Sequence, residues 1–169
     1  MAYKTVLTVV RGDVTDSALD GAVAFAQAQD AHLDILALGI DVSAPGLYYA
    51  GANAMVEQQA IERAREEADE TETAVKAAME GAAVRWSVAA GVAQVGTIQH
   101  FVGLQARFAD IVVLPQPYGE GRTAADEAIL ESALFDGQVP VLVLPKGAAL
   151  RETKRPVVAW NQRDRKSVV

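Results

Sequence analysis

Strand-like and helix-like segments alternate strictly along the chain, and this alternation constrains the fold more than any other feature. Five apolar stretches rich in β-branched residues predict strands, and helical apolar spacing follows each of the first four. The expected strands cover residues 4–10, 32–40, 82–91, 110–115 and 138–145, and the expected helices begin at residue 15 or 16 and cover 53–80, 92–109 and 122–136. This order predicts an α/β fold, with a doubly wound, open parallel five-stranded sheet and helices on both faces.

Three loops follow strands at the end of the sheet where such folds bind ligands. In a doubly wound sheet, ligands lie outside the carboxyl ends of the strands, where the winding reverses. The loops to inspect are therefore 11–13, 41–46 and 115–121.

The composition is that of a globular protein with a full hydrophobic core. Hydrophobic residues make up 51% of the 169, and residues 1–150 suffice for one α/β domain. No apolar run reaches the roughly 20 residues of a membrane span, and the first residues lack the features of a signal peptide. The chain has no cysteine, which excludes disulfides and thiolate metal sites. We expect a cytoplasmic protein with no membrane contact and no metal site.

Charge is distributed unevenly between the body of the chain and its last residues. The net charge is −7, but residues 1–150 carry a net −11, while residues 151–169 hold six Lys or Arg against two acids. An acidic body repels a nucleic-acid backbone, so we expect no nucleic-acid partner.

Several features together resemble the universal stress proteins over residues 4–147. They are the element order, the long second helix, the opening "VLTVVRGDVTDSAL" and the ending "ALFDGQVPVLVLP". The resemblance implies a universal stress protein-like, adenine nucleotide alpha hydrolase-like fold and a role in stress response. It also implies a homodimer formed through the fifth strand, Val139 to Leu144. An apolar edge strand favours such pairing.

The resemblance also implies where a nucleotide would bind. Family members that bind ATP or AMP carry a loop of the form G-x2-G-x9-G-(S/T) after the fourth strand. Gly121 matches the second glycine and Ser132 the final serine, while Tyr118 and Glu131 stand where glycines belong. Alignment from the fifth strand instead places Glu127 and Ala128 at the final pair, so both registers put a glutamate at a glycine.

This exchange predicts a degraded nucleotide site. A glutamate beside a phosphate would cost about 4 kcal/mol at 4 Å and an effective dielectric near 20. Gly119, Gly121 and Ala124 also mimic a dinucleotide fingerprint, although that pattern belongs after the first strand of its unit. We expect no cofactor, with ATP or AMP as the alternative.

The end of the first strand departs from the family as well. Similar family members have an aspartate there that contacts the nucleoside, whereas this chain has Arg11, followed by Gly12 and Asp13. One interpretation is an arginine that binds an anion; the other is a surface arginine paired with an acid. The candidate ligand residues are Arg11, Gly12, Asp13, Gly119, Gly121 and Ser132.

Signals for catalysis are weak. His32 and His100 lie in unrelated segments, and we find no nucleophile elbow, zinc-protease motif or P-loop. The acids of the long helix are spaced along a solvated face. Tyr48 and Tyr49 form either an aromatic wall over a ligand or a packing contact. We predict no catalytic residues.

The last residues permit two interpretations. "RPVVAWN" resembles the opening strand of a second domain of this family, so residues 151–169 are either the truncated start of such a domain or a basic tail with an extra strand. The function we predict is a dimerising or regulatory scaffold in stress response. The alternatives are an ATP- or AMP-binding protein, with slow ATPase activity as a variant, and a flavin or electron-transfer module.

Overall fold

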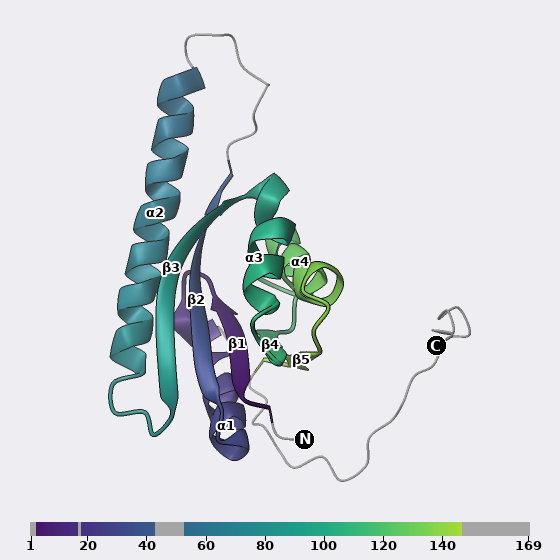
Figure 1. Cartoon of the computed structure of the whole chain (residues 1–169). Helices are drawn as coiled ribbons and strands as arrows, with labels where there is room; N and C mark the ends of the chain where they lie inside the picture. Colours follow the sequence, from purple (N-terminus) through teal and green to yellow (C-terminus); the bar gives the residue numbers. More distant parts are fainter. Residues whose placement is uncertain (1–2, 17, 43–52, 147–169) are drawn as a thin grey trace, which may run out of the picture.

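One parallel sheet organises the structure, with the strand order β3-β2-β1-β4-β5 (Figure 1). The computed structural model describes residues 3–16, 18–42 and 53–146. The strands are β1 Thr5–Val10, β2 His32–Asp41, β3 Arg85–Gln94, β4 Ile111–Pro115 and β5 Val141–Leu144. The chain winds outward from β1 to β3 and then returns to the other side of β1. The predicted fold class is confirmed.

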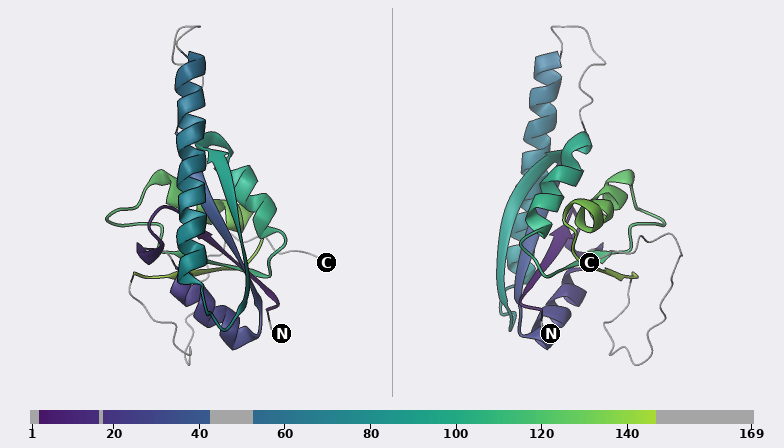
Figure 2. Two further views of the ribbon diagram at one scale, coloured as in Figure 1. Left: turned by 90° about the vertical axis from the view of Figure 1, so that its left-hand side faces the viewer. Right: turned by 45° about the vertical axis from the view of Figure 1, so that its right-hand side comes forward.

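Helices cover both faces of this sheet (Figure 2). On one face lie α1 (Leu19–Gln29) and α2 (Asn53–Ala78), and on the other α3 (Ile98–Ala106) and α4 (Ala124–Glu131). A π-helical turn, η3, continues α4 over Ser132–Asp136, and short 3-10 turns cover Val14–Asp16 and Val95–Thr97.

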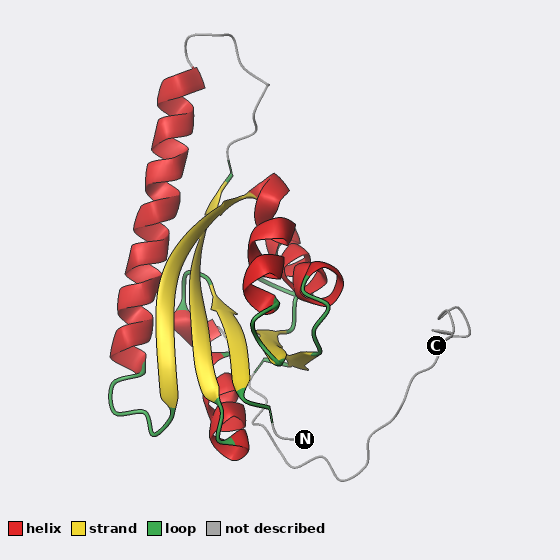
Figure 3. Cartoon of the chain, in the orientation of Figure 1, coloured by secondary structure: helices red, strands yellow, loops and turns green. Residues whose placement is uncertain are grey.

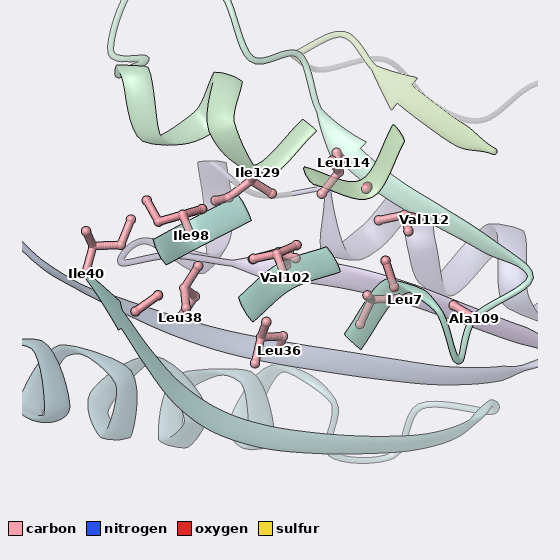
Figure 4. Close-up of a cluster of buried hydrophobic side chains, with 14 residues drawn as sticks. Leu7, Leu36, Leu38, Ile40, Ile98, Val102, Ala109, Val112, Leu114 and Ile129 are labelled. Atoms are coloured by element: carbon pink, nitrogen blue, oxygen red, sulfur yellow. The ribbon is translucent and has the colours of Figure 1, made fainter. Parts of the chain in front are cut away.

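Two hydrophobic clusters hold the layers together. Figure 4 shows the cluster between the sheet and α3 with α4, in which Ile98 and Val102 lie over Leu38 and Leu36, and Ile129 lies beside Ile98. The second cluster lies under α1 and α2 and includes Leu33 and Val75, which are fully buried. Because both faces are covered, the central strands are apolar on both sides, as the sequence pattern predicts.

The region around β3 corrects three expectations. The strand runs to Gln94, beyond the predicted 82–91, because the ten-residue β2 offers a pairing partner to every one of its residues. Consequently α3 begins at Ile98 and not at residue 92. Val95 and Phe108, two apolar positions of the helix predicted over 92–109, are 52% and 82% exposed, because both lie outside the shorter α3.

Some expectations fall on residues outside the described ranges. Tyr48, Tyr49 and the segment 151–169 are among them. Within the described ranges, we find no helix with the length and apolarity of a membrane span.

Candidate functional site

A cavity of about 240 Å³ lies where the winding of the sheet reverses, at the carboxyl ends of β1 and β4. Its apolar part comes from the ends of these strands and from α4, namely Val9, Leu114, Pro115 and Ile129. Its polar part comes from the loops after both strands, from α2 and from the first turn of α4. The polar lining residues are Arg11, Gly12, Asp13, Glu67, Gly121, Arg122, Thr123 and Asp126.

The loop after β1 turns sharply beside the cavity. Gly12 has φ of 56°, in the left-handed region that glycine adopts without steric cost. The Asp13 carboxylate then accepts hydrogen bonds from the backbone N–H and the hydroxyl of Thr15, each at 2.8 Å. Asp13 thus fixes the turn into the Val14–Asp16 helix, as short polar side chains commonly do.

The side chain of Arg11 reaches across the cavity to the start of α4. Its Nη1 lies 3.1 Å from Asp126 Oδ1 and 3.5 Å from the hydroxyl of Thr123. The two charged side chains are only 23% and 14% exposed. Arg11 therefore pairs with an acid, which is part of the second interpretation of this residue. Its buried Nε has no hydrogen-bond partner among the described residues.

Asp126 also caps the amino terminus of α4. Its Oδ2 accepts hydrogen bonds from the backbone N–H of the N-cap residue Thr123 at 2.7 Å and from the Thr123 hydroxyl at 2.9 Å. A helix amino terminus carries partial positive charge and unpaired N–H groups, and these attract anions. Here an anion from within the chain occupies this position.

The loop between β4 and α4 is open to solvent on its outer side. Gly119 and Gly121 have φ of 116° and 79°, and the N–H of Arg122 bonds the carbonyl of Gly119 at 3.2 Å. A second hollow of about 380 Å³ adjoins the cavity at Gly121 and Arg122. Its remaining lining residues are Gln116, Tyr118, Glu120 and Lys146.

The structure separates the candidate residues into two groups. Arg11, Gly12, Asp13 and Gly121 line the cavity together, and Gly119 lies two residues before Gly121 in the same loop. Ser132 lies elsewhere: it is fully buried, and its hydroxyl donates to the backbone carbonyl of Gln99 in α3.

Glu131 does not have the position that the sequence argument required. It is the exposed last residue of α4 and does not line the cavity. In the first register Glu131 therefore lies at the end of α4 away from the cavity, and Glu127, its counterpart in the second register, is likewise exposed and does not line the cavity. The carboxylate beside the expected phosphate position is that of Asp126.

Four polar cavity residues escaped the sequence analysis, namely Glu67, Arg122, Thr123 and Asp126. The spacing of Thr123 and Asp126 is that of a capping box, S/T-x-x-E/Q, with Asp in place of Glu, and this signal could have located the helix start. Glu67 lies on α2, among acids that all resemble a solvated face. No local pattern distinguishes it.

The histidines do not contribute to this site. His32 begins β2, at the opposite end of the sheet, where it contacts Ser87 and Asp34 at 3.2 Å each. His100 lies on an exposed position of α3. The cavity lining therefore contains no histidine, and its polar groups are carboxylates, guanidinium groups and one hydroxyl.

Comparisons with known proteins agree with this architecture. Neither protein-family models nor curated protein sequences gave a match. Among solved structures, a universal stress protein family member from Burkholderia pseudomallei is 22% identical, with a TM-score of 0.51 over 85% of this chain and 96% of that one. A universal stress protein from Lactobacillus plantarum is 17% identical, with a TM-score of 0.56 over 85% and 99%.

A third similar structure is that of a hypothetical protein whose biochemical function was assigned from its structure. It is 16% identical, with a TM-score of 0.59 over 88% of this chain and 100% of that one. At such identities the likeness concerns the fold, because one fold serves many functions. The resemblance seen in the sequence is thus supported, and the chain has the fold of the universal stress proteins.

Proposed function

We propose that this chain is a universal stress protein-like domain that acts in stress response as a dimerising or regulatory scaffold, without catalysis of its own. The position of Asp126 carries the proposal. Its carboxylate bonds the N-cap of α4 and the guanidinium of Arg11. The two groups that would attract a phosphate are therefore already paired with an internal anion.

Charge repulsion is the physical reason why this arrangement disfavours a nucleotide. A phosphate at the start of α4 would lie beside the Asp126 carboxylate, and two unit charges 4 Å apart repel by about 4 kcal/mol at an effective dielectric near 20. That is about half of the 8 kcal/mol that corresponds to micromolar affinity. A nucleotide would have to displace Asp126 from both partners.

The scaffold role rests on the outer edge of β5. Val143 of this strand is 37% exposed, and no described strand pairs with the edge that faces away from β4. An exposed apolar edge favours pairing with another chain. We propose a homodimer through Val139–Leu144, as in the expectation from the resemblance.

An adenine-nucleotide binder is the second candidate, and the location of the cavity favours it. The cavity lies at the switch point, and the adjoining hollow carries Arg122 and Lys146, whose positive charges suit phosphates. In that case Arg11, Gly12, Asp13, Gly119 and Gly121 would surround an ATP or AMP molecule. Ser132 would contact it only after leaving Gln99.

Titration calorimetry with ATP and with AMP tests the proposal. We expect no binding to the wild-type chain at ligand concentrations up to millimolar. The Asp126→Asn variant keeps the shape of the side chain and removes its charge, so we expect binding to appear. Glu131→Gln is the matched control, because it removes an acid at the far end of the same helix.

The outcomes separate the two candidates. Wild-type binding of either nucleotide at micromolar affinity would overturn the scaffold proposal. Binding gained by both variants would mean that overall charge, and not the position of Asp126, excludes the ligand. Failure of Asp126→Asn to bind would remove the electrostatic reason given above.

A further inference from the structure

The sheet has a second edge, which is longer than the β5 edge. Strand β3 contains ten residues, and its only partner among the described strands is β2 (Figure 3). Five of its residues are exposed, whereas none of the ten residues of β2 is. The backbone groups on the outer side of β3 therefore have no partner within the described sheet.

The usual protections of an edge strand are absent from β3. Natural edges are short, bulged, charged or interrupted by proline. This strand pairs with β2 through ten consecutive residues without a bulge, and it contains no proline and no acid. Its single charge is Arg85, its first residue, whose guanidinium donates to the Asp30 carbonyl at 2.9 Å. Residues 86–94 form an uncharged template for another strand.

We infer that β3 pairs with β3 of a second copy of this chain, antiparallel, across a two-fold axis at Ala90. A two-fold axis perpendicular to the sheet keeps the helix-covered faces together and makes the contact self-complementary. Trp86 and Val88 pack on the cluster under α2, whereas Gly91 faces Phe101 of α3, so even-numbered residues share the α2 face.

The register at Ala90 matches side chains well. When Ala90 lies opposite Ala90 of the second copy, Val88 of each copy lies opposite Val92 of the other on the α2 face. Ala89 lies opposite Gly91 on the other face, where both side chains are small. Cross-strand pairs of β-branched residues stabilise antiparallel sheets, and no like charges meet along the pairing.

The area of such a contact indicates its strength. Pairing of nine residues along one edge gives less than the roughly 1,200 Å² that a stable interface buries, so we expect a weak dimer. The contact is independent of the β5 dimer proposed above. If both edges pair, alternating two-fold contacts build an open ribbon of domains instead of a closed dimer.

Cysteine cross-linking tests the pairing, since the chain has no cysteine of its own. In the Ala90→Cys variant, two thiols would meet at the axis, within the 4.4–6.8 Å separation of Cα atoms that a disulfide requires. We expect mild oxidation to give a covalent dimer at least about tenfold faster than in the Ala77→Cys control, because pairing raises the effective concentration. Ala77 is exposed on the outer side of α2.

A variant that adds a charge tests the same contact without covalent cross-linking. Ala90→Lys places two ammonium groups opposite each other, and we expect sedimentation velocity to show loss of the concentration-dependent association that goes beyond the β5 dimer. Circular dichroism verifies its fold, and Ala77→Lys is its control. Equal cross-linking rates in the Ala90→Cys and Ala77→Cys variants, or a wild-type chain that stays monomeric up to millimolar, would overturn the inference. Val143→Cys reports the β5 contact separately, so failure of one edge does not imply failure of the other.

Discussion

The chain between β4 and β5 begins at an open rim and ends in a tightly packed joint. In the rim, Gly119–Thr123, a Cβ atom on Gly119 or Gly121 would meet no other atom within 4 Å. In the joint, formed by Gly103 of α3 and Ser132–Gly137, a Cβ on Gly103 would lie 2.5 Å from the Cβ of Asp136. The nucleotide-binding pattern of the sequence therefore spans two regions with different physical roles, since Gly121 lies in the rim and Ser132 in the joint.

Close approach of two helices explains the joint. A Cβ on Gly137 would lie 2.7 Å from the Ala133 carbonyl oxygen and from the Ala106 Cβ. The Ser132 hydroxyl bonds the Gln99 carbonyl, and Arg107 Nε donates to the Asp136 carbonyl at 3.1 Å. Small residues and polar links thus hold η3 against α3. The comparison of rim and joint shows that Ser132, the serine of a phosphate-binding pattern, here helps to pack η3 against α3.

Gly103→Ala should produce the largest effect on the joint. In a free helix this change stabilises by about 1 kcal/mol, because glycine has high conformational entropy. Here the added methyl collides with Asp136, and overpacking of this kind costs about 1–3 kcal/mol. We expect a lower free energy of unfolding in urea.

Gly96→Ala is the matched control for that measurement. Gly96 also lies in a helical turn, and a Cβ there would meet no atom within 4 Å. We expect little change or a small gain in stability. If Gly103→Ala were as stable as Gly96→Ala, the joint would not be tightly packed.

Ser132→Ala should have the next largest effect. It removes the buried hydroxyl that bonds the Gln99 carbonyl, and loss of such a hydrogen bond costs about 1–2 kcal/mol. We expect a lower midpoint of urea unfolding and calorimetric titrations with AMP identical to those of the wild type. If the variant had unchanged stability but altered titrations with AMP, Ser132 would act at the ligand site and not in the joint.

The sequence predicted the sheet better than the site, for physical reasons. Apolar runs such as "DIVVL" reflect burial on both faces, which is a local property of the strand. Arg11 and Asp126 meet only because β1 and β4 are neighbours in the sheet, and their separation in the sequence conceals that contact. The role of Ser132 depends on the packing of α3 against η3, which also leaves no local signal.

Gly121→Ala tests the rim and should have a smaller effect than the changes in the joint. Its φ of 79° suits glycine, and placing an L-residue in the left-handed region costs about 1 kcal/mol. No packing penalty adds to this, because the space around the position is open. We expect a small fall in the free energy of unfolding by urea. A loss as large as that of Gly103→Ala would mean that the rim is packed as well.

Asp110 provides the smallest expected effect, and it lies directly before β4, at the opposite end of this strand from the rim. Its Oδ2 accepts the backbone N–H groups of Lys4 at 2.6 Å and Thr5 at 3.0 Å, tying β1 to the start of β4. These two donors lower the pKa of the Asp110 carboxyl from 3.8, against a small opposing effect of burial. A lowered pKa in the folded state means that the folded chain favours the ionised form.

The sign of the pH dependence follows from this shift. The contribution of Asp110 to stability is fully present above the unfolded-state pKa near 3.8 and disappears as the pH falls through the lower folded-state value. Asp110→Asn should therefore be slightly less stable than the wild type at neutral pH, and the gap in unfolding midpoint should close in acid. Thermal melts of both proteins between neutral pH and pH about 3 measure that gap. A gap that widens in acid would show that the two backbone donors do not favour the ionised carboxylate. The same series on Gly103→Ala and Gly121→Ala should show constant gaps, because neither change removes a titrating group.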